Sequence, residues 1–357
     1  MYFILVISLL SLGMIAMFSA SSESARTDYK DVYFFLKKQM IAAGIGMFVM
    51  FFMANFNYKN LQVLALPSFL ACIFLLILVL VIGTETKGAT RWLDLGFISF
   101  QPSEILKISV ILFFAQSLSV NGKMLKNFWK GLFPYLCVLG VVSLLLMLQP
   151  HFSATAIIVL IGVSLLFLAG ANLKHLFILG AGGFVGACLL IFTSEYRLKR
   201  VISALDPFAD KLGDGYQSVQ SLYAIGSGGL FGLGLGRSRQ KFLYIPEPHN
   251  DFVFSIWCEE LGFVGAFLVL TLFALLIYRG ISIAMNAPNT FSSLTAMGIT
   301  ILIAIQVIIN VAVVSALVPV TGMPLPFFSF GGTTLVINMA SMGIMLNISR
   351  YSKTGKV

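Results

Sequence analysis

A short polar cluster in this sequence stands directly before an apolar run. Residues 246–251 read Pro-Glu-Pro-His-Asn-Asp, and the mostly apolar segment 252–257 follows without a break. An ionisable side chain at membrane depth is costly, so such a residue is a candidate for function. A carboxylate can accept the proton of a hydroxyl group that attacks another centre. We therefore expect any chemistry of this chain to centre on Asp251.

Glu104 and Lys107 form a second candidate pair. Pro102, Ser103 and Glu104 predict the start of a helix, with Ser103 as its cap and the acid near the positive helix end. Lys107 lies three residues after Glu104 and therefore shares its helix face. The two residues are either an internal ion pair of a capped helix or part of a site that faces a cavity.

Arginine and lysine residues supply candidate anion sites. Arg91 adjoins Trp92, and this combination serves either as an anchor at the membrane interface or as a guanidinium that binds a phosphate. Arg237, Arg239 and Lys241 bring three cations within five residues. They form either a solvated run of charge or an anion site, and the neighbouring Gln and Ser side chains favour the anion site.

The elements that must position these residues are membrane helices. Hydrophobic residues make up 59% of the 357 residues and charged residues 10%, whereas a soluble domain has roughly 25% charged residues. Spanning a membrane takes about 20 mostly apolar residues, and lipid-exposed backbone there must be helical. The sequence predicts an all-α polytopic membrane protein with ten transmembrane helices, at roughly 2–20, 35–56, 61–83, 105–120, 132–148, 153–169, 174–193, 252–278, 293–315 and 331–349.

The distribution of charge predicts the orientation of these helices. The alternate connections at 57–60, 121–131, 170–174 and 279–292 and the tail from 349 hold nine Lys or Arg residues and no Asp or Glu. The positive-inside rule places this side, with both termini, in the cytoplasm. We interpret the first segment as a retained anchor, since no basic region precedes it and further spans follow. The net charge of +9 then reflects topology and attraction to membrane lipids, and the scattered cations argue against nucleic-acid binding.

We expect a single integral membrane domain, residues 1–357, with function concentrated on its outer face. The large extracytoplasmic loop between helices seven and eight, residues 194–251, is the longest polar segment. Its glycine-rich stretch 226–236 matches neither a Walker motif nor a dinucleotide fingerprint, and we expect it to be re-entrant or closely packed. The Pro-rich stretch 319–332 predicts a pocket wall. The His and Cys residues have no metal-binding spacing, so we expect no metal site.

Four groups of motifs occur in order along the chain. They are Phe100 to Glu104 with Lys107, Gly215 to Gln217 with Gln220 and Ser221, Pro246 to Phe252 with Glu259 to Gly262, and Pro319 to Gly332. Taken together, these motifs resemble the SEDS family, the shape, elongation, division and sporulation proteins that include RodA, FtsW and SpoVE. The resemblance spans the chain, and the stretch 220–241 looks closer to the FtsW and SpoVE branch than to RodA. Two positions depart from the family pattern: Asn250 stands where Thr is expected, and His151 stands where an acid is expected.

The resemblance implies a peptidoglycan glycosyltransferase of the bacterial cytoplasmic (inner) membrane. The family polymerises lipid II, a disaccharide-peptide on a polyprenyl pyrophosphate, into glycan strands at the outer membrane face. Its members work with a class B penicillin-binding protein that crosslinks the product, in the programmes of cell shape, cell division and sporulation. Asp251 matches the family's catalytic aspartate.

The implied reaction accounts for one lead carboxylate among several cations. Asp251 acts as general base for the 4-hydroxyl of the acceptor sugar. The pyrophosphate leaving group needs positive charge rather than a protonating acid, and attack opposite to it inverts the donor. No cofactor is evident, and a divalent cation, Mg²⁺ or Mn²⁺, is an alternative source of that charge. We expect Glu104 to position Lys107, and the whole substrate-binding set to be Arg91, Glu104, Lys107, Arg197, Arg200, Gln217, Gln220, Ser221, Lys241 and His249.

Two other functions use the same features. A lipid II flippase also needs an anion-binding cavity, but it needs access from both faces, and the predicted cytoplasmic connections are short and hold no acidic residues. A non-enzymatic scaffold that activates a penicillin-binding protein would not depend on Asp251. Glycan polymerisation by the purified protein, compared with its Asp251→Asn variant, separates these functions.

Overall fold

A computed structural model of the chain describes residues 1–86, 89–94, 99–193, 195–213, 215–242 and 244–352, except for the side chains of Glu85, Thr86, Ala89, Lys123, Phe184, Ala187, Leu190, Ile191, Tyr196 and Arg197. Each of the ten predicted apolar segments forms an α-helix, because a helix satisfies its backbone groups internally where water is absent. These helices are α1 (Tyr2–Tyr29), α2 (Phe34–Asn55), α3 (Tyr58–Ile82), α4 (Pro102–Asn121), α5 (Phe133–Leu148), α6 (Phe152–Leu168), α7 (Leu173–Phe192), α10 (Val253–Met285), α11 (Thr290–Val314) and α12 (Gly332–Arg350).

The length and composition of these helices identify a multi-pass membrane protein. Eight helices among the described residues are long and apolar enough to cross a membrane, and α5 is counted there together with the preceding π-helix η2 (Phe128–Leu132). A 3₁₀ helix, η1 (Gly122–Lys126), follows α4. Helix α6 is apolar but shorter, with 17 residues.

The all-α fold class is confirmed, and a small sheet that the sequence did not predict lies in the polar segment between α3 and α4. This segment contains three short strands, β1 (Thr84–Thr86), β2 (Ala89–Asp94) and β3 (Ser99–Phe100), which form an antiparallel sheet in the order β1-β2-β3. Leu93 of β2 pairs with Phe100 of β3. Thr and Trp side chains favour strands, and a sheet edge is tolerated outside the hydrocarbon region because water can satisfy it.

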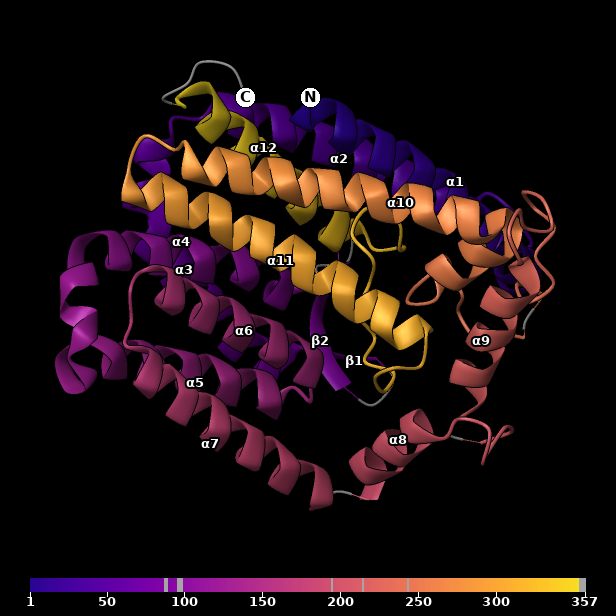
Figure 1. Cartoon of the computed structure of the whole chain (residues 1–357). Helices are drawn as coiled ribbons and strands as arrows, with labels where there is room; N and C mark the ends of the chain where they lie inside the picture. The colour runs from indigo at the N-terminus through magenta and orange to yellow at the C-terminus, as the bar shows by residue number, and fades with distance from the viewer. Residues whose placement is uncertain (87–88, 95–98, 194, 214, 243, 353–357) are drawn as a thin grey trace.

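The predicted long loop, residues 194–251, contains ordered helices. α8 (Glu195–Leu205) and α9 (Tyr216–Gly228) both lie within it. α9 packs against α10 and α11, whereas α8 packs against the outlying α7. Figure 1 shows α8 and α9 at the end of the bundle away from the two chain termini.

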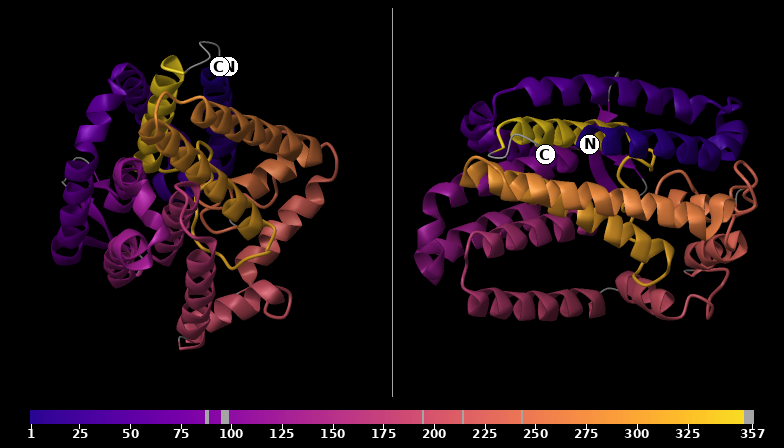
Figure 2. Two further views of the ribbon diagram at one scale, coloured as in Figure 1. Left: turned by 60° about the vertical axis from the view of Figure 1, so that its left-hand side comes forward. Right: turned by 45° about the horizontal axis from the view of Figure 1, so that its top comes forward.

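The bundle is organised around α12. This helix packs against α1, α2, α3, α4, α10 and α11, most extensively against α2. A buried amide fixes that contact, since Asn347 Nδ2 of α12 donates to the carbonyl of Ala54 at 2.8 Å. The views in Figure 2 show α7 at the margin of the bundle, where its main neighbours are α6 and α8.

Helix α10 is interrupted at Gly262, whose φ of 63° and ψ of −161° are not helical. The glycine-rich stretch bonds to the backbone groups on both sides of the interruption. Leu233 N donates to Glu259 O at 3.0 Å, and Phe263 N donates to Gly229 O at 2.9 Å. A Cβ built on Gly232 would lie 2.1 Å from the carbonyl oxygen of Glu260. The prediction that this stretch is closely packed is therefore confirmed.

Replacing Gly232 with alanine should destabilise the protein. Gly232 has a φ of +77°, and an added Cβ would meet backbone atoms that cannot rotate away. We expect Gly232→Ala to lower stability by about 2 kcal/mol or more, visible as a lower apparent unfolding temperature in detergent. Gly226→Ala is the matched control, since nothing lies within 4 Å of its Cβ. Equal unfolding temperatures for the two variants would contradict the close packing.

Candidate functional site

A cavity of about 840 Å³ lies where the polar ends of several helices meet. Its volume is within the range of small-molecule sites. The walls come from the end of α1, the starts of α2, α4, α6 and α12, strand β2, and the segments before α10 and α12. The charged and imidazole side chains that line it are Asp28, Lys38, Arg91, Glu104, Lys107, His151, Glu247, His249 and Asp251.

Asp251 is held at the cavity by its backbone. Asn310, buried on α11, donates from Nδ2 to the carbonyl of Asp251 at 2.9 Å and to the carbonyl of Met323 at 2.7 Å. This single amide therefore ties the segment before α10 to the Pro-rich segment before α12. Asp251 itself is half-buried and lines the cavity.

His249 connects the same segment to α2. Its imidazole is 5% exposed and packs on the ring of Phe35, with 4.2 Å between ring centroids. Its carbonyl accepts a hydrogen bond from Phe330 N at 2.8 Å. The buried Gln39 of α2 donates to Ser329 O at 3.2 Å and accepts from Gly331 N at 3.2 Å. These contacts give the aspartate segment a fixed position relative to the Pro-rich wall.

Glu104 and Lys107 form a buried ion pair at the start of α4. Pro102 is the first residue of this helix, as its fixed φ favours. Lys107 Nζ lies 2.6 Å from Glu104 Oε1, and their side chains are 4% and 8% exposed, respectively. Both residues also line the cavity, so the ion pair and a site that faces a cavity are the same arrangement. The predicted cap is wrong, because the N-cap residue is Gln101, which makes no side-chain cap hydrogen bond, and Ser103 lies inside the helix. An anion in the cavity would meet the ammonium group of Lys107.

Arg91 projects from strand β2 to the turn between α5 and α6. Its Nε donates to Gln149 O at 3.4 Å, and its Nη2 donates to Pro150 O. The strand thus places Arg91 beside the cavity together with its neighbour Trp92. The planar guanidinium group has five N–H donors, and their geometry matches the oxygens of a phosphate group.

Lys38 is a cavity cation that sequence reasoning did not select. It lies near the start of α2, is exposed, and lines the cavity. Its Nζ lies 4.3 Å from the centroid of the Phe34 ring. The sequence signal was the Lys37-Lys38 pair at the outer mouth of a predicted span, where a cation is easily interpreted as a flanking charge.

The structure brings five predicted site residues to one cavity and gives the others different surroundings. Arg91, Glu104, Lys107, His249 and Asp251 line the cavity. Lys241 instead lies in a separate buried network with Glu260. Arg200 is exposed and donates to Val320 O at 2.8 Å, and the side chain of Arg197 lies outside the described residues.

Three predicted substrate contacts lie on α9, next to the cavity-forming helices rather than on the cavity wall. Ser221 is buried, shares a hydrogen bond of 2.7 Å with Ser255 Oγ of α10 and donates to Val314 O of α11 at 2.5 Å. Gln217 and Gln220 are half-buried on the same helix. In this structure Ser221 joins α9 to α10 and α11.

His151 occupies the turn before α6 and lines the cavity. Burial, together with the positive charges of Arg91 and Lys107, lowers the pKa of His151 to about 3. The imidazole is therefore neutral at neutral pH, and it can donate or accept a hydrogen bond there without adding charge.

The low pKa of His151 predicts a stability that depends on pH. The unfolded state takes up the proton near pH 6.5, whereas the folded state does not until about pH 3. Stability should therefore fall as the pH drops below 6.5, by about 1.4 kcal/mol per pH unit from this group. We expect the apparent unfolding temperature of His151→Gln to change less between pH 7.5 and 5 than that of the wild type. Parallel curves for the two proteins would contradict a neutral, half-buried His151.

The described residues do not bring three His, Cys, Asp or Glu side chains together in a group that could hold a metal ion. The positive charge in the described part of the cavity comes from Lys38, Arg91 and Lys107. These cations and the carboxylate of Asp251 suit a reaction in which a hydroxyl group is deprotonated while an anionic group is bound or released.

Comparison with known proteins identifies relatives of this chain. Residues 1–354 match the model of the FtsW, RodA and SpoVE family, described as cell cycle protein. Stage V sporulation protein E of Bacillus subtilis is 44% identical over 352 residues, which cover 98% of this chain and 96% of that protein. A probable peptidoglycan glycosyltransferase FtsW of Geobacter sulfurreducens is 37% identical over 352 residues, which cover 98% of this chain and 94% of that protein.

Solved structures are similar over nearly the whole chain. A chain from work on the structural coordination of polymerization and crosslinking by a peptidoglycan synthase complex matches with a TM-score of 0.82 and 29% identity, covering 98% of this chain and 96% of that one. The rod shape determining protein RodA of Thermus thermophilus matches with a TM-score of 0.74 and 30% identity, covering 99% of this chain and 96% of that one.

Proposed function

This chain belongs to the family of FtsW, RodA and SpoVE, and from that premise we propose that it is a peptidoglycan glycosyltransferase with Asp251 as its general base. The observation that carries the assignment is the cavity in which Asp251 and the cations Lys38, Arg91 and Lys107 line one space. The relatives named as peptidoglycan glycosyltransferases support the reaction class.

The proposed topology has ten spans with both termini in the cytoplasm and the cavity on the outer face of the bacterial inner membrane. The cations of the short connections support this orientation by the positive-inside rule. The cavity is formed by the ends of the helices that lie opposite the predicted cytoplasmic connections. Lipid II, exposed at that face, is the substrate in this proposal.

The sugar transfer begins at the acceptor hydroxyl. The carboxylate of Asp251 accepts the proton of the 4-hydroxyl group while the oxygen of that hydroxyl group bonds to the anomeric carbon of the donor. The bond between that carbon and the pyrophosphate oxygen breaks at the same time, and the polyprenyl pyrophosphate leaves with the bonding electrons. Attack from the face opposite the leaving group converts an α-linked donor into a β-linked glycan.

The cations of the cavity stabilise the charge that develops on the leaving group. Arg91 can offer paired N–H groups to phosphate oxygens, and Lys107 offers a buried ammonium whose position is set by Glu104. Lys38 lines the cavity from a different element, α2, and is available to a second pyrophosphate on the acceptor lipid. The reaction needs two lipid-linked sugars at once, so cations on more than one wall suit it.

A divalent ion, Mg²⁺ or Mn²⁺, enters the proposal as a companion of the pyrophosphate rather than as a resident of a protein site. The described side chains do not gather a three-ligand group, so no step is assigned to the ion. Titration of EDTA and Mg²⁺ against the polymerisation rate tests this part.

A class B penicillin-binding protein is the proposed partner. The solved peptidoglycan synthase complex, in which polymerization and crosslinking are coordinated, supports this assignment by its similarity to the chain. Crosslinking requires a glycan strand as its substrate, so a polymerase and a transpeptidase gain from being held together.

Purified protein in liposomes, with lipid II supplied to the outside only, tests the function. We expect glycan polymer on the side of the lipid supply, and none with Asp251→Asn. Movement of lipid II to the inner leaflet without polymer would instead identify a flippase. Normal complementation of a deletion strain by the same Asp251→Asn variant would identify a non-enzymatic scaffold.

A further inference from the structure

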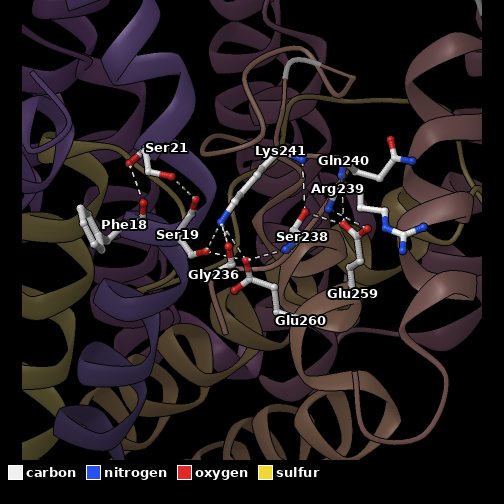
Figure 3. A network of polar contacts seen from close by, with 11 residues as sticks. Phe18, Ser19, Ser21, Gly236, Ser238, Arg239, Gln240, Lys241, Glu259 and Glu260 are labelled. Atoms are coloured by element: carbon white, nitrogen blue, oxygen red, sulfur yellow. Dashed lines mark hydrogen bonds and ion pairs between the residues drawn. The ribbon is translucent and has the colours of Figure 1, made fainter. Parts of the chain in front are cut away.

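A buried polar network lies beside the cavity but does not line it. Glu259 and Glu260, the last acidic residues before the interruption of α10, are each 1% exposed. Lys241 Nζ lies 3.3 Å from Glu260 Oε1, and their side chains are 5% and 2% exposed. Figure 3 shows both carboxylates turned toward the segment 236–241. A charge that is buried to this extent is stable only when it is paired or hydrogen-bonded.

Glu260 and Lys241 join three parts of the chain. Ser19 Oγ of α1 donates to Glu260 Oε1 at 2.6 Å and accepts from Lys241 Nζ at 3.3 Å. Lys241 Nζ also donates to Gly236 O at 2.6 Å, and Ser238 N donates to Glu260 Oε1 at 3.3 Å. α1 and the segment 236–241 are thereby fixed to α10 (Figure 3).

Glu259 binds the backbone of the same segment. Arg239 N donates to Glu259 Oε1 at 3.0 Å, and Gln240 N donates to Glu259 Oε2 at 3.2 Å. Ser238 Oγ donates to Glu259 Oε2 as well. We call the set Ser19, Ser238, Lys241, Glu259 and Glu260 the glutamate clasp.

The clasp is one hydrogen bond away from the cavity wall. The carbonyl of Gln240, whose amide the clasp binds, accepts from Ile245 N at 3.2 Å. Ile245 is fully buried and lines the cavity. The segment from Ile245 to Asp251 then returns to the start of α10. Both ends of this segment are thus attached to the same stretch of helix, which rises about 10 Å between Val253 and Glu260.

We propose that Glu260 and Lys241 are positioning residues that hold Asp251 in place for proton abstraction. This inference rests on the proposed function of the cavity. Within the part of the chain that the structure describes, the clasp residues are not among those that line the cavity, and the candidate phosphate-binding residues Arg91 and Lys107 belong to other elements, β2 and α4. Loosening the clasp should therefore displace the base while leaving substrate binding largely intact.

Single substitutions in the clasp leave a buried charge without its partner, and a paired substitution removes both charges. We expect Glu260→Gln and Lys241→Met each to lower kcat of glycan polymerisation by at least about tenfold, with KM changed less than about threefold. The double variant Glu260→Gln/Lys241→Met should regain most of that kcat, since replacing both members of a buried pair is often tolerated. Lys199→Met, in an exposed pair with Glu195 at 3.0 Å, is the control and should leave kcat unchanged.

Hydrogen–deuterium exchange gives a second readout that does not depend on activity. Peptides that contain Arg239, Gln240 and Ile245 should exchange faster in each single variant and return to wild-type protection in the double variant. Unchanged exchange and kcat in folded single variants would overturn the clasp, as would a rise in KM without a fall in kcat. Wild-type protein that forms no polymer, with exchange behaving as expected, would overturn the proposed function and keep the clasp as an anchor of the segment.

Discussion

Asp251→Asn should abolish glycan polymerisation and leave the fold intact. The amide has the shape of the carboxyl group but cannot accept the proton of the acceptor hydroxyl, and general base catalysis contributes about 10²–10⁴-fold. The backbone carbonyl of Asp251, which Asn310 binds at 2.9 Å, is unchanged in the variant. We therefore expect a loss of at least about 100-fold in kcat, measured with purified protein and lipid II, and an unaltered unfolding temperature.

Asp28→Asn is the matched control for this prediction. Asp28 lines the same cavity from the end of α1 but is exposed. Loss of an exposed charge costs about 0.5 kcal/mol, so the control should remain within about threefold of wild type. A loss as large for Asp28→Asn as for Asp251→Asn would mean that the variants act through the overall charge of the cavity rather than through a base.

Hydropathy predicted the helices because backbone N–H and C=O groups in a membrane must bond to one another, and a helix achieves this within one segment. Ten apolar segments had to be helical, and each of them is. Outside the membrane the same constraint is absent. The strands in 84–100 and the helices α8 and α9 in 194–251 depend on local pairing and packing, which hydropathy does not record.

Lys107 and Lys241 show which contacts of the site could be predicted from the sequence and which could not. Glu104 and Lys107 are three residues apart on one helix, so their contact followed from helix geometry. Lys241 and Glu260 are nineteen residues apart, and their pairing depends on the interruption of α10 at Gly262 and on the fold of the glycine-rich stretch. A cation count along the chain therefore assigned Lys241 to the substrate, whereas the buried network accounts for its charge.

Lys38 illustrates a second limit. Its place beside the cavity comes from the packing of α2 against α12 and from the Pro-rich segment that Gln39 binds. Neither contact is visible in the order of residues around it. A lysine at the mouth of a span is usually a flanking charge, so the sequence pattern favoured the common interpretation.

Variants of the buried pair of Glu104 and Lys107 should affect the unfolding temperature and the polymerase activity differently. Lys107→Met leaves the carboxylate of Glu104, 8% exposed, without its partner at 2.6 Å. Breaking a buried pair in this way costs about 3–5 kcal/mol, so this variant should unfold at a clearly lower temperature and lose polymerase activity. That result alone would not distinguish a structural lysine from one that binds pyrophosphate.

The double variant Glu104→Gln/Lys107→Met provides the distinction. Removing both charges should restore most of the unfolding temperature, since no unpaired charge stays buried. Activity should remain low by at least about 100-fold, because a buried donor that stabilises developing charge contributes about 3–4 kcal/mol. Recovery of activity together with stability would show that Lys107 has no part in binding the leaving group.

An exposed pair supplies the control for this series. Lys37 and Asp31 lie 2.8 Å apart with side chains 66% and 38% exposed, and the hydrogen bond from Lys37 lowers the pKa of Asp31. Asp31→Asn/Lys37→Met should change neither the unfolding temperature nor kcat appreciably, since water and salt screen an exposed pair. Because Lys37 and Asp31 are exposed and are not among the residues that line the cavity, unchanged values would show that the effects at Lys107 depend on its burial or on its access to the cavity.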